Sequence, residues 1–197
     1  MKAIIGSVHR AGSNYLASVL NQAVSDYTIE GEDFDTVSKY KGNKEDFLSY
    51  VQAFIDNKPS NYVHISPQFT YLAKDLEVDK VAFLIRNPYD HALSKVNLDS
   101  KWKDELLDNL ISDIELFYGY IAKGRNKVFK YENLDKKGIE SVAKYLGLDC
   151  DLKGIDLSKG VNRSRGSFES LEDAIIDKEK LKDLMKAIKK YQKRFKY

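Results

Sequence analysis

The chain is long enough to bury a core of its own, since 197 residues with 43% hydrophobic and 31% charged side chains are typical of an ordinary soluble domain. A single cysteine, Cys150, excludes an intrachain disulfide framework and a zinc site built from cysteines. Three prolines and 11 glycines leave no low-complexity linker, and the first apolar run is too short for a signal peptide or a membrane span. We therefore expect one soluble, cytoplasmic domain over residues 1–197.

The predicted elements begin with a strand over residues 3–5, a polar loop over 6–14 and a helix over 14–24. The loop contains Gly6, Arg10 and Gly12. Free backbone N–H groups and the helix dipole converge at such a helix N-terminus, and Arg10 adds a positive charge. The loop therefore predicts a site for a phosphate-like anion.

Strands and helices alternate along the rest of the chain. The sequence predicts strands over 27–30, 62–65, 80–85 and 127–131, and helices over 44–57, 68–76, 88–97, 103–123 and 136–146. The strand at 80–85 is a continuous apolar run, which is typical of a strand covered on both faces. This alternation predicts a three-layer α/β/α sandwich with a mostly parallel central sheet, of the kind found in P-loop NTPases. Ligands of such sheets bind beyond the carboxyl ends of the strands, where the 6–14 loop falls.

The small net charge of +2 hides a basic C-terminal segment. Residues 178–197 contain nine Lys or Arg and two acids, a net charge of +7, which leaves −5 for residues 1–177. Apolar residues recur there at helical spacing, so we expect a basic amphipathic helix over residues 171–197 that docks by its apolar side. Holding an anionic substrate or a membrane surface is the alternative use of its lysines. No nucleic-acid partner is expected, because the rest of the chain is acidic.

A second polar motif follows the strand at 80–85. Arg86 ends that strand, Pro88 suits the first turn of the next helix, and Ser94 lies eight residues after Arg86. A guanidinium group and a hydroxyl facing it can hold a second, separate phosphate. The first loop is not a Walker A motif, since that motif requires Gly-Lys-Ser/Thr and here the cation Arg10 precedes Gly12.

With these motifs the chain resembles the sulfotransferases that use 3′-phosphoadenosine 5′-phosphosulfate (PAPS). In that family a loop of the type Arg/Lys-Ser-Gly-Thr-Thr holds the 5′-phosphosulfate, and residues 10–15 read Arg-Ala-Gly-Ser-Asn-Tyr here. The family's 3′-phosphate motif is Arg-Asn-Pro with a serine eight residues on, which Arg86 and Ser94 match. Residues 128–134 and 142–148 resemble its Tyr-Glu-Asp-Leu and Phe-Leu-Gly-Leu segments. The resemblance covers about residues 2–148.

The resemblance implies a set of donor-binding residues. For the 5′-phosphosulfate these are His9, Arg10, Ala11, Gly12, Ser13, Asn14 and Tyr15, and for the 3′-phosphate they are Arg86 and Ser94. Ala11 and Asn14 replace the usual hydroxyl residues, so some bonds to the 5′-phosphate are missing or made differently, although Asn14 can still donate and cap the helix. The family's late loop over the 3′-phosphate is best matched by Asn162, Arg163 and Arg165. These three residues close on the nucleotide or on an anionic acceptor, or belong to an ordinary solvated loop.

Two residues compete for the general base that takes the acceptor's proton. Glu32 resembles the glutamate of a Gly-Glu-Pro-Phe turn in carbohydrate-type members, and His64 stands roughly where cytosolic members carry a histidine. We place Glu32 first and His64 second. A solvated acid on a turn and a satisfied histidine at a strand end are the structural alternatives. Arg10 is the third catalytic candidate, because it can stabilise charge on the leaving phosphate and the transferred group.

The expected reaction moves a sulfuryl group from PAPS to a hydroxyl or amine of an acceptor, with a carbohydrate or small metabolite as the leading choice. No carboxylate cluster resembles a magnesium site, so no metal requirement is expected. Two other functions stay open: a P-loop-like nucleotide or metabolite kinase, and a non-catalytic nucleotide-binding protein with the same fold.

Overall fold

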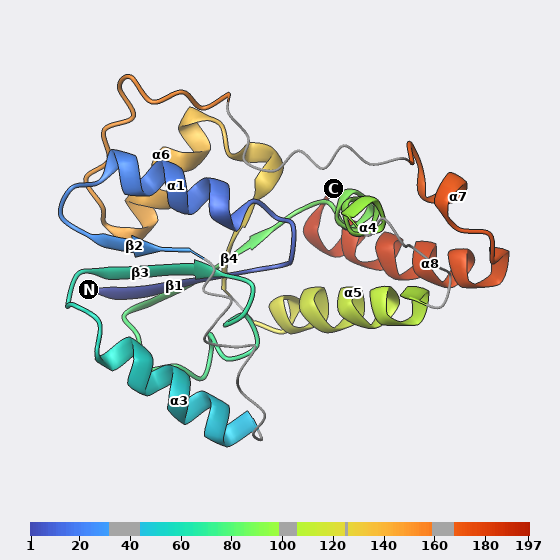
Figure 1. Cartoon of the computed structure of the whole chain (residues 1–197), viewed down its shortest axis with the longest axis horizontal. Coiled ribbons are helices and arrows are strands. Elements are labelled where there is room, and N and C mark those ends of the chain that lie inside the picture. The colour runs from blue at the N-terminus through green and yellow to red at the C-terminus, as the bar shows by residue number, and fades with distance from the viewer. Residues whose placement is uncertain (32–43, 99–105, 125, 159–167) are drawn as a thin grey trace. The chain divides into compact units, whose positions relative to one another are not determined.

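A computed structural model of the chain describes residues 1–31, 44–98, 106–124, 126–158 and 168–197 (Figure 1). The chain divides into two compact units. The first, which we call the sheet unit, comprises Met1–Ile85 and Asn126–Val161. The second, the helical unit, comprises Arg86–Arg125 and Asn162–Tyr197.

The sheet unit contains a five-stranded, all-parallel sheet in the order β2-β3-β1-β4-β5. Its strands are β1 (Lys2–Ser7), β2 (Thr28–Glu30), β3 (Tyr62–Ser66), β4 (Lys80–Ile85) and β5 (Lys127–Lys130). The strands β1, β3 and β4 are mostly buried, and the residues from Ala82 to Ile85 in β4 form an apolar run that is buried throughout. The two edge strands are short and partly exposed.

Helices cover both faces of this sheet (Figure 1). The helices α1 (Ser13–Ala23) and α6 (Lys136–Leu146) lie on one face, and α3 (Lys44–Asp56) lies on the other. A 3₁₀ turn, η2 (Tyr131–Asn133), follows β5. The three-layer α/β/α sandwich with a parallel sheet is therefore confirmed.

The helical unit contains α4 (Pro88–Leu98), α5 (Leu107–Ala122), α7 (Leu171–Ala174) and α8 (Lys178–Phe195). The apolar side of α8 is buried, with Tyr191 stacked on Tyr118 of α5 at 5.7 Å between ring centroids. In place of one helix over 171–197, the chain forms α7 and then a separate α8. The break has a local cause, because Asp177 caps α8 by accepting hydrogen bonds from the backbone N–H groups of residues 179 and 180, both at 3.0 Å.

One predicted element is wrong. Residues 68–76 form consecutive turns instead of a helix, with hydrogen bonds from Thr70 N to Pro67 O (3.2 Å) and from Leu72 N to Phe69 O (3.0 Å). The Thr70 hydroxyl donates to the carbonyl of Ser7 at 2.8 Å, so this segment is bound to the end of β1. The buried Phe69, Leu72, Ala73 and Leu76 keep the spacing that predicted a helix, so burial alone does not distinguish the helix from these turns. No helix within the described ranges is long and apolar enough to cross a membrane.

Candidate functional site

The predicted anion loop connects β1 to α1 at the carboxyl end of the sheet (Figure 1). Its ends are fixed by hydrogen bonds: Val8 N donates to Leu84 O at 3.1 Å, and Ala11 N donates to Val8 O at 3.2 Å. Val8 and Ala11 are fully buried, whereas His9 and Arg10 are half-buried. Buried apolar side chains therefore hold the loop, and its basic side chains are the ones that keep access to solvent.

The backbone of the loop adopts the left-handed conformation at two positions. Arg10 has φ +63° and Gly12 has φ +81°, so two residues separated by one position are left-handed. Alternation of this kind forms a concave nest of N–H groups that binds anions. Gly12 also occupies the N-cap of α1, where no side chain caps the helix. Since glycine has no side chain, Gly12 itself does not supply the capping hydrogen bond that a Ser, Thr or Asp would supply at this position.

A tyrosine from a distant part of the chain covers Gly12. The ring of Tyr131, in η2, lies where a Cβ at Gly12 would come within 2.5 Å of two ring carbons. Sequence reasoning placed Tyr131 only at the end of a strand and missed its position against the loop. Glycine is therefore required at position 12 for two reasons: the backbone is left-handed there, and the Tyr131 ring leaves no room for a Cβ.

The first turn of α1 contains the remaining loop residues. Ser13 is buried, and Asn14 places its Oδ1 3.3 Å from where a Cβ on Gly31 would stand, just after β2. The Tyr15 hydroxyl donates to the carbonyl of Leu157 at 3.0 Å. Burial, with the nearby charges of Tyr131 and Asp156, raises the pKa of Tyr15, so this residue stays a neutral donor. The structure therefore brings residues 9–15 together in one turn of the sheet unit.

Sequence reasoning also missed Ser7, the last residue of β1. Its side chain is fully buried, and its hydroxyl oxygen has no hydrogen-bond partner among the residues that the structure describes. A buried hydroxyl without a hydrogen-bond partner is rare in folded proteins.

His64 lies in the interior of the sheet unit. Its side chain is fully buried, stacks on Phe69 at 4.4 Å between ring centroids, and meets Phe54 edge-on at 6.1 Å. Its Nδ1 lies 2.9 Å from the hydroxyl of Tyr62. These contacts are those of a histidine that stabilises the sheet, and the ring is closed to solvent.

A chain of polar groups continues from His64 to the surface. The Tyr62 hydroxyl donates to Glu30 Oε2 at 2.7 Å, and Lys58 Nζ donates to both oxygens of Glu30 at 2.9 and 2.8 Å. Since the single proton of Tyr62 is used on Glu30, Nδ1 of His64 is the donor in their contact. Burial raises the pKa of Glu30, but the hydrogen bonds from Lys58 and Tyr62 outweigh it and hold that pKa below its usual value.

The second predicted motif begins the helical unit. Asn87 is the N-cap of α4: its Oδ1 accepts from Tyr89 N at 3.0 Å, and its carbonyl accepts from His91 N at 2.8 Å. Gln192 of α8 donates to the same Oδ1 at 2.9 Å. The carbonyl of Arg86 accepts from the Tyr118 hydroxyl at 2.8 Å. Asn87 and Pro88 thus start α4, and they leave Arg86 half-buried just before a helix N-terminus.

Ser94 lies on α4, eight residues after Arg86, and is 7% exposed. The anion loop belongs to the sheet unit, and Arg86 and Ser94 belong to the helical unit. Glu32, Asn162, Arg163 and Arg165 lie outside the described residues. Within the described ranges, no group of three or more His, Cys, Asp or Glu side chains is placed to hold a metal ion.

No protein-family model matches the chain, and no curated protein matches it. Among solved structures, the chain is similar to a sulfotransferase from Alicyclobacillus acidocaldarius, with a TM-score of 0.54 and 12% sequence identity. The alignment covers 98% of this chain and 92% of that one. At this identity the likeness concerns the fold, and the fold of the whole chain is thus similar to that of a bacterial sulfotransferase.

Proposed function

We propose that the chain is a sulfotransferase that moves a sulfuryl group from PAPS to a hydroxyl or amine of an acceptor. The observation that carries the proposal is the nest at Arg10 and Gly12, which opens α1 without a side-chain cap. It supports a site for the 5′-phosphosulfate, because such a nest and helix N-terminus bind phosphate groups. The similar fold of a bacterial sulfotransferase supports the same proposal.

Arg86 and Ser94 would hold the 3′-phosphate. Arg86 precedes the N-cap of α4, where the helix dipole favours an anion, and a guanidinium group can bind phosphate through two parallel hydrogen bonds. The 3′-phosphate distinguishes PAPS from ATP. This second motif therefore supports a sulfuryl donor over a phosphoryl donor.

The chemistry needs alignment and charge stabilisation more than covalent help from the protein. The acceptor oxygen or nitrogen attacks sulfur in line, its bond to sulfur forms as the sulfur–oxygen bond to the 5′-phosphate breaks, and 3′,5′-adenosine bisphosphate (PAP) leaves. Arg10 and the backbone N–H groups of residues 12–14 stabilise the charge that builds on the leaving phosphate. The acceptor's proton goes to Glu32 in this proposal. His64, the second choice, is fully buried and would first have to become accessible to the acceptor.

The acceptor is proposed to be a carbohydrate or a small hydroxylated metabolite, on the basis of the glutamate at position 32. No metal takes part in the proposed reaction, since the leaving group is a stabilised phosphate and Arg10 supplies positive charge. Turnover should therefore survive EDTA. Loss of turnover on EDTA treatment, with recovery on adding Mg²⁺, would contradict this part of the proposal.

Calorimetry of the full chain with PAP and with ATP tests the function. We expect tight binding of PAP and weak binding of ATP. Arg10→Gln should weaken PAP binding by roughly tenfold or more, because it removes a charged hydrogen-bond donor. Lys137→Gln, which removes one exposed charge from α6, is the matched control and should bind as the wild type does. Tighter binding of ATP than of PAP would overturn the proposal in favour of a kinase, and PAP binding without turnover on any acceptor would favour a non-catalytic protein.

A further inference from the structure

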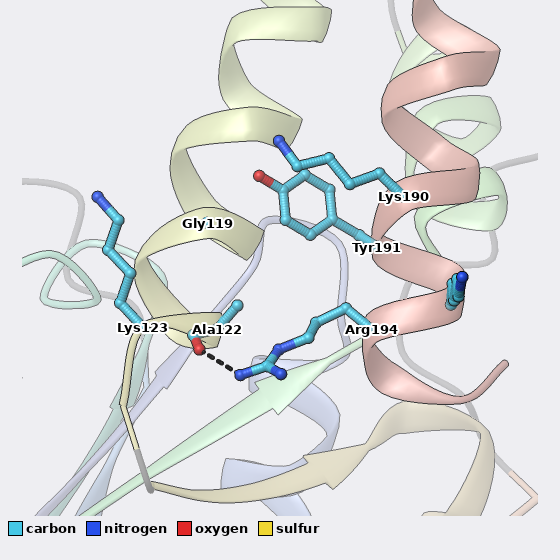
Figure 2. Close-up of a pocket in the computed structure, with 7 residues that line it drawn as sticks. Gly119, Ala122, Lys123, Lys190, Tyr191 and Arg194 are labelled. Carbon is cyan, nitrogen blue, oxygen red and sulfur yellow. Dashed lines mark hydrogen bonds between the residues drawn. The ribbon is translucent and has the colours of Figure 1, made fainter.

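The helical unit contains an open cleft between the C-terminal ends of α5 and α8 (Figure 2). Its volume is about 620 Å³, and it is lined by Gly119, Ala122, Lys123, Lys190, Tyr191, Lys193 and Arg194. Four of these seven residues are cationic and none is acidic. Figure 2 shows Tyr191 and Arg194 extending from α8 toward α5. The cleft thus presents a concentrated positive charge, and none of its seven lining residues belongs to the motifs that the proposed function uses.

Some of this charge is held in place by the protein. Arg194 Nη2 donates to the carbonyl of Ala122 at 2.8 Å and so caps the end of α5. Lys190 Nζ pairs with Glu115 Oε2 at 2.5 Å, and the Tyr191 hydroxyl donates to the same oxygen at 2.5 Å. Lys123 and Lys193 are exposed and have no ion pair with any carboxylate in the described part of the chain. Glu115 therefore balances only part of the charge, and the cleft stays positive.

At Lys193, one rim of the cleft meets a row of lysines on the solvent-facing side of α8. Lys182, Lys186, Lys189 and Lys193 recur at intervals of four, three and four residues, which places them on one side of the helix. All four are exposed, and they lie opposite the buried Leu184, Ile188 and Tyr191. We call these four residues the lysine row. From Lys182 to Lys193 the helix advances by eleven steps, or about 16 Å at 1.5 Å per residue. A band of this length suits a linear polyanion better than a single small anion.

Two classes of polyanion fit the cleft poorly. A membrane-binding helix inserts its apolar side into the lipid, but that side of α8 is buried within the protein. Single-stranded nucleic acid needs exposed rings on which bases stack, and the aromatic residue of the cleft, Tyr191, is only 4% exposed.

We propose that the cleft and the lysine row bind a sulfated or carboxylated polysaccharide. The positive charge of the cleft and of the lysine row is the reason to expect that a polyanion binds. Its identity as a polysaccharide rests on the proposed function, since the acceptor must carry hydroxyl or amino groups. The cleft would hold a stretch of the acceptor chain other than the group that is modified, and would raise the local concentration of acceptor on the enzyme.

Binding of size-defined heparin octasaccharide to the full chain tests the proposal, with neutral dextran as the uncharged control. We expect octasaccharide binding that weakens as salt is raised, and no dextran binding. The triple variant K186Q/K189Q/K193Q should lose roughly tenfold or more in affinity. The matched control K136Q/K137Q/K144Q removes the same charge from exposed positions of α6 and should bind as the wild type does. Both variants should keep the wild-type affinity for PAP, which shows that they are folded.

Three results would overturn the proposal: wild-type octasaccharide affinity in K186Q/K189Q/K193Q, tighter binding of oligothymidylate than of octasaccharide, and tighter binding of anionic phospholipid vesicles. The PAP measurement separates this proposal from the function on which it rests. Octasaccharide binding without PAP binding would support the polyanion site at the cleft and the lysine row, and would contradict the proposed sulfotransferase function. PAP binding without octasaccharide binding would support the proposed function and contradict the polyanion site.

Discussion

Gly12 and Arg10 determine the shape of the anion loop through their left-handed backbone conformations, with φ of +81° and +63°. An L-residue in this region costs about 1 to 2 kcal/mol, so Arg10 is strained within the loop. Strained residues gather at ligand sites, where the surrounding structure enforces them. Here the buried side chains of Val8 and Ala11, which flank residues 9–10, hold Arg10 in this conformation.

Gly12→Ala should distort the loop, because the new Cβ meets both the left-handed φ and the Tyr131 ring at 2.5 Å. We expect a loss of stability of about 1 to 3 kcal/mol and a loss of PAP affinity of roughly tenfold or more, measured by urea unfolding and calorimetry.

Gly154→Ala is the matched control for this change. Gly154 has φ +79° and no atom within 4 Å of a new Cβ, so its replacement carries the backbone cost without a clash. It should leave PAP affinity unchanged. Wild-type PAP affinity in Gly12→Ala would show that the loop does not hold the nucleotide.

Glu30 predicts a dependence of stability on pH. Burial raises its pKa, but hydrogen bonds from Lys58 and Tyr62 hold it below its usual value in the folded chain. A carboxylate of this kind stabilises the fold above its unfolded pKa, about 4.3, and loses that contribution as pH falls through the folded pKa. The wild type should therefore exceed Glu30→Gln in free energy of unfolding at pH 7, and the difference should shrink as pH falls below about 4.

Urea unfolding at pH 7 and at a pH below about 4 measures the difference in free energy of unfolding between the wild type and Glu30→Gln. Glu140→Gln is the control, since Glu140 is exposed on α6 and has no ion pair with any Lys or Arg in the described ranges. Its difference from the wild type should stay small at both pH values. An equal deficit of Glu30→Gln at pH 7 and in acid would contradict the role of Lys58 and Tyr62.

Among the elements, α8 depends on its N-cap. Asp177 accepts two backbone hydrogen bonds at 3.0 Å and starts the helix that carries the lysine row. Asp177→Ala should lower the free energy of unfolding by about 1 kcal/mol. Asp183→Ala, an exposed change on the same helix, should have little effect. Equal effects of the two changes in urea unfolding would mean that the cap does not stabilise α8.

The elements that the sequence predicted best are those with local signals at both ends. The helix over 136–146 has its predicted bounds, because Asp135 accepts from Gly138 N at 2.8 Å and Gly147 ends the helix with φ +77°. The strand over 80–85 is also as predicted, since all of its residues after Lys80 are apolar. The prediction failed for residues 68–76 because their turns are stabilised by burial and by a hydrogen bond from Thr70 to the carbonyl of Ser7. That bond joins distant residues, so the local sequence does not indicate it.

For the whole molecule, the sequence predicted the parallel sheet and the loop at its carboxyl edge, because both follow from patterns within a few residues. It did not predict the ring of Tyr131 against Gly12, or the chain of contacts from Lys58 through Glu30 and Tyr62 to His64. Apart from the contact of Tyr62 with His64, these contacts join residues far apart in the sequence, and they depend on strand order and register. The cleft between α5 and α8 was missed for the same reason.

The central claim is that the chain recognises a nucleotide with two separate phosphate groups. The most direct test compares the affinities of PAP and AMP, which differ by the 3′-phosphate, in the wild type and in Arg86→Gln. We expect the wild type to bind PAP more tightly than AMP by roughly tenfold or more, and the ratio to fall close to one in Arg86→Gln. Equal affinity of the wild type for PAP and AMP, or an unchanged ratio in Arg86→Gln, would contradict the assignment of Arg86 and the sulfotransferase function built on it.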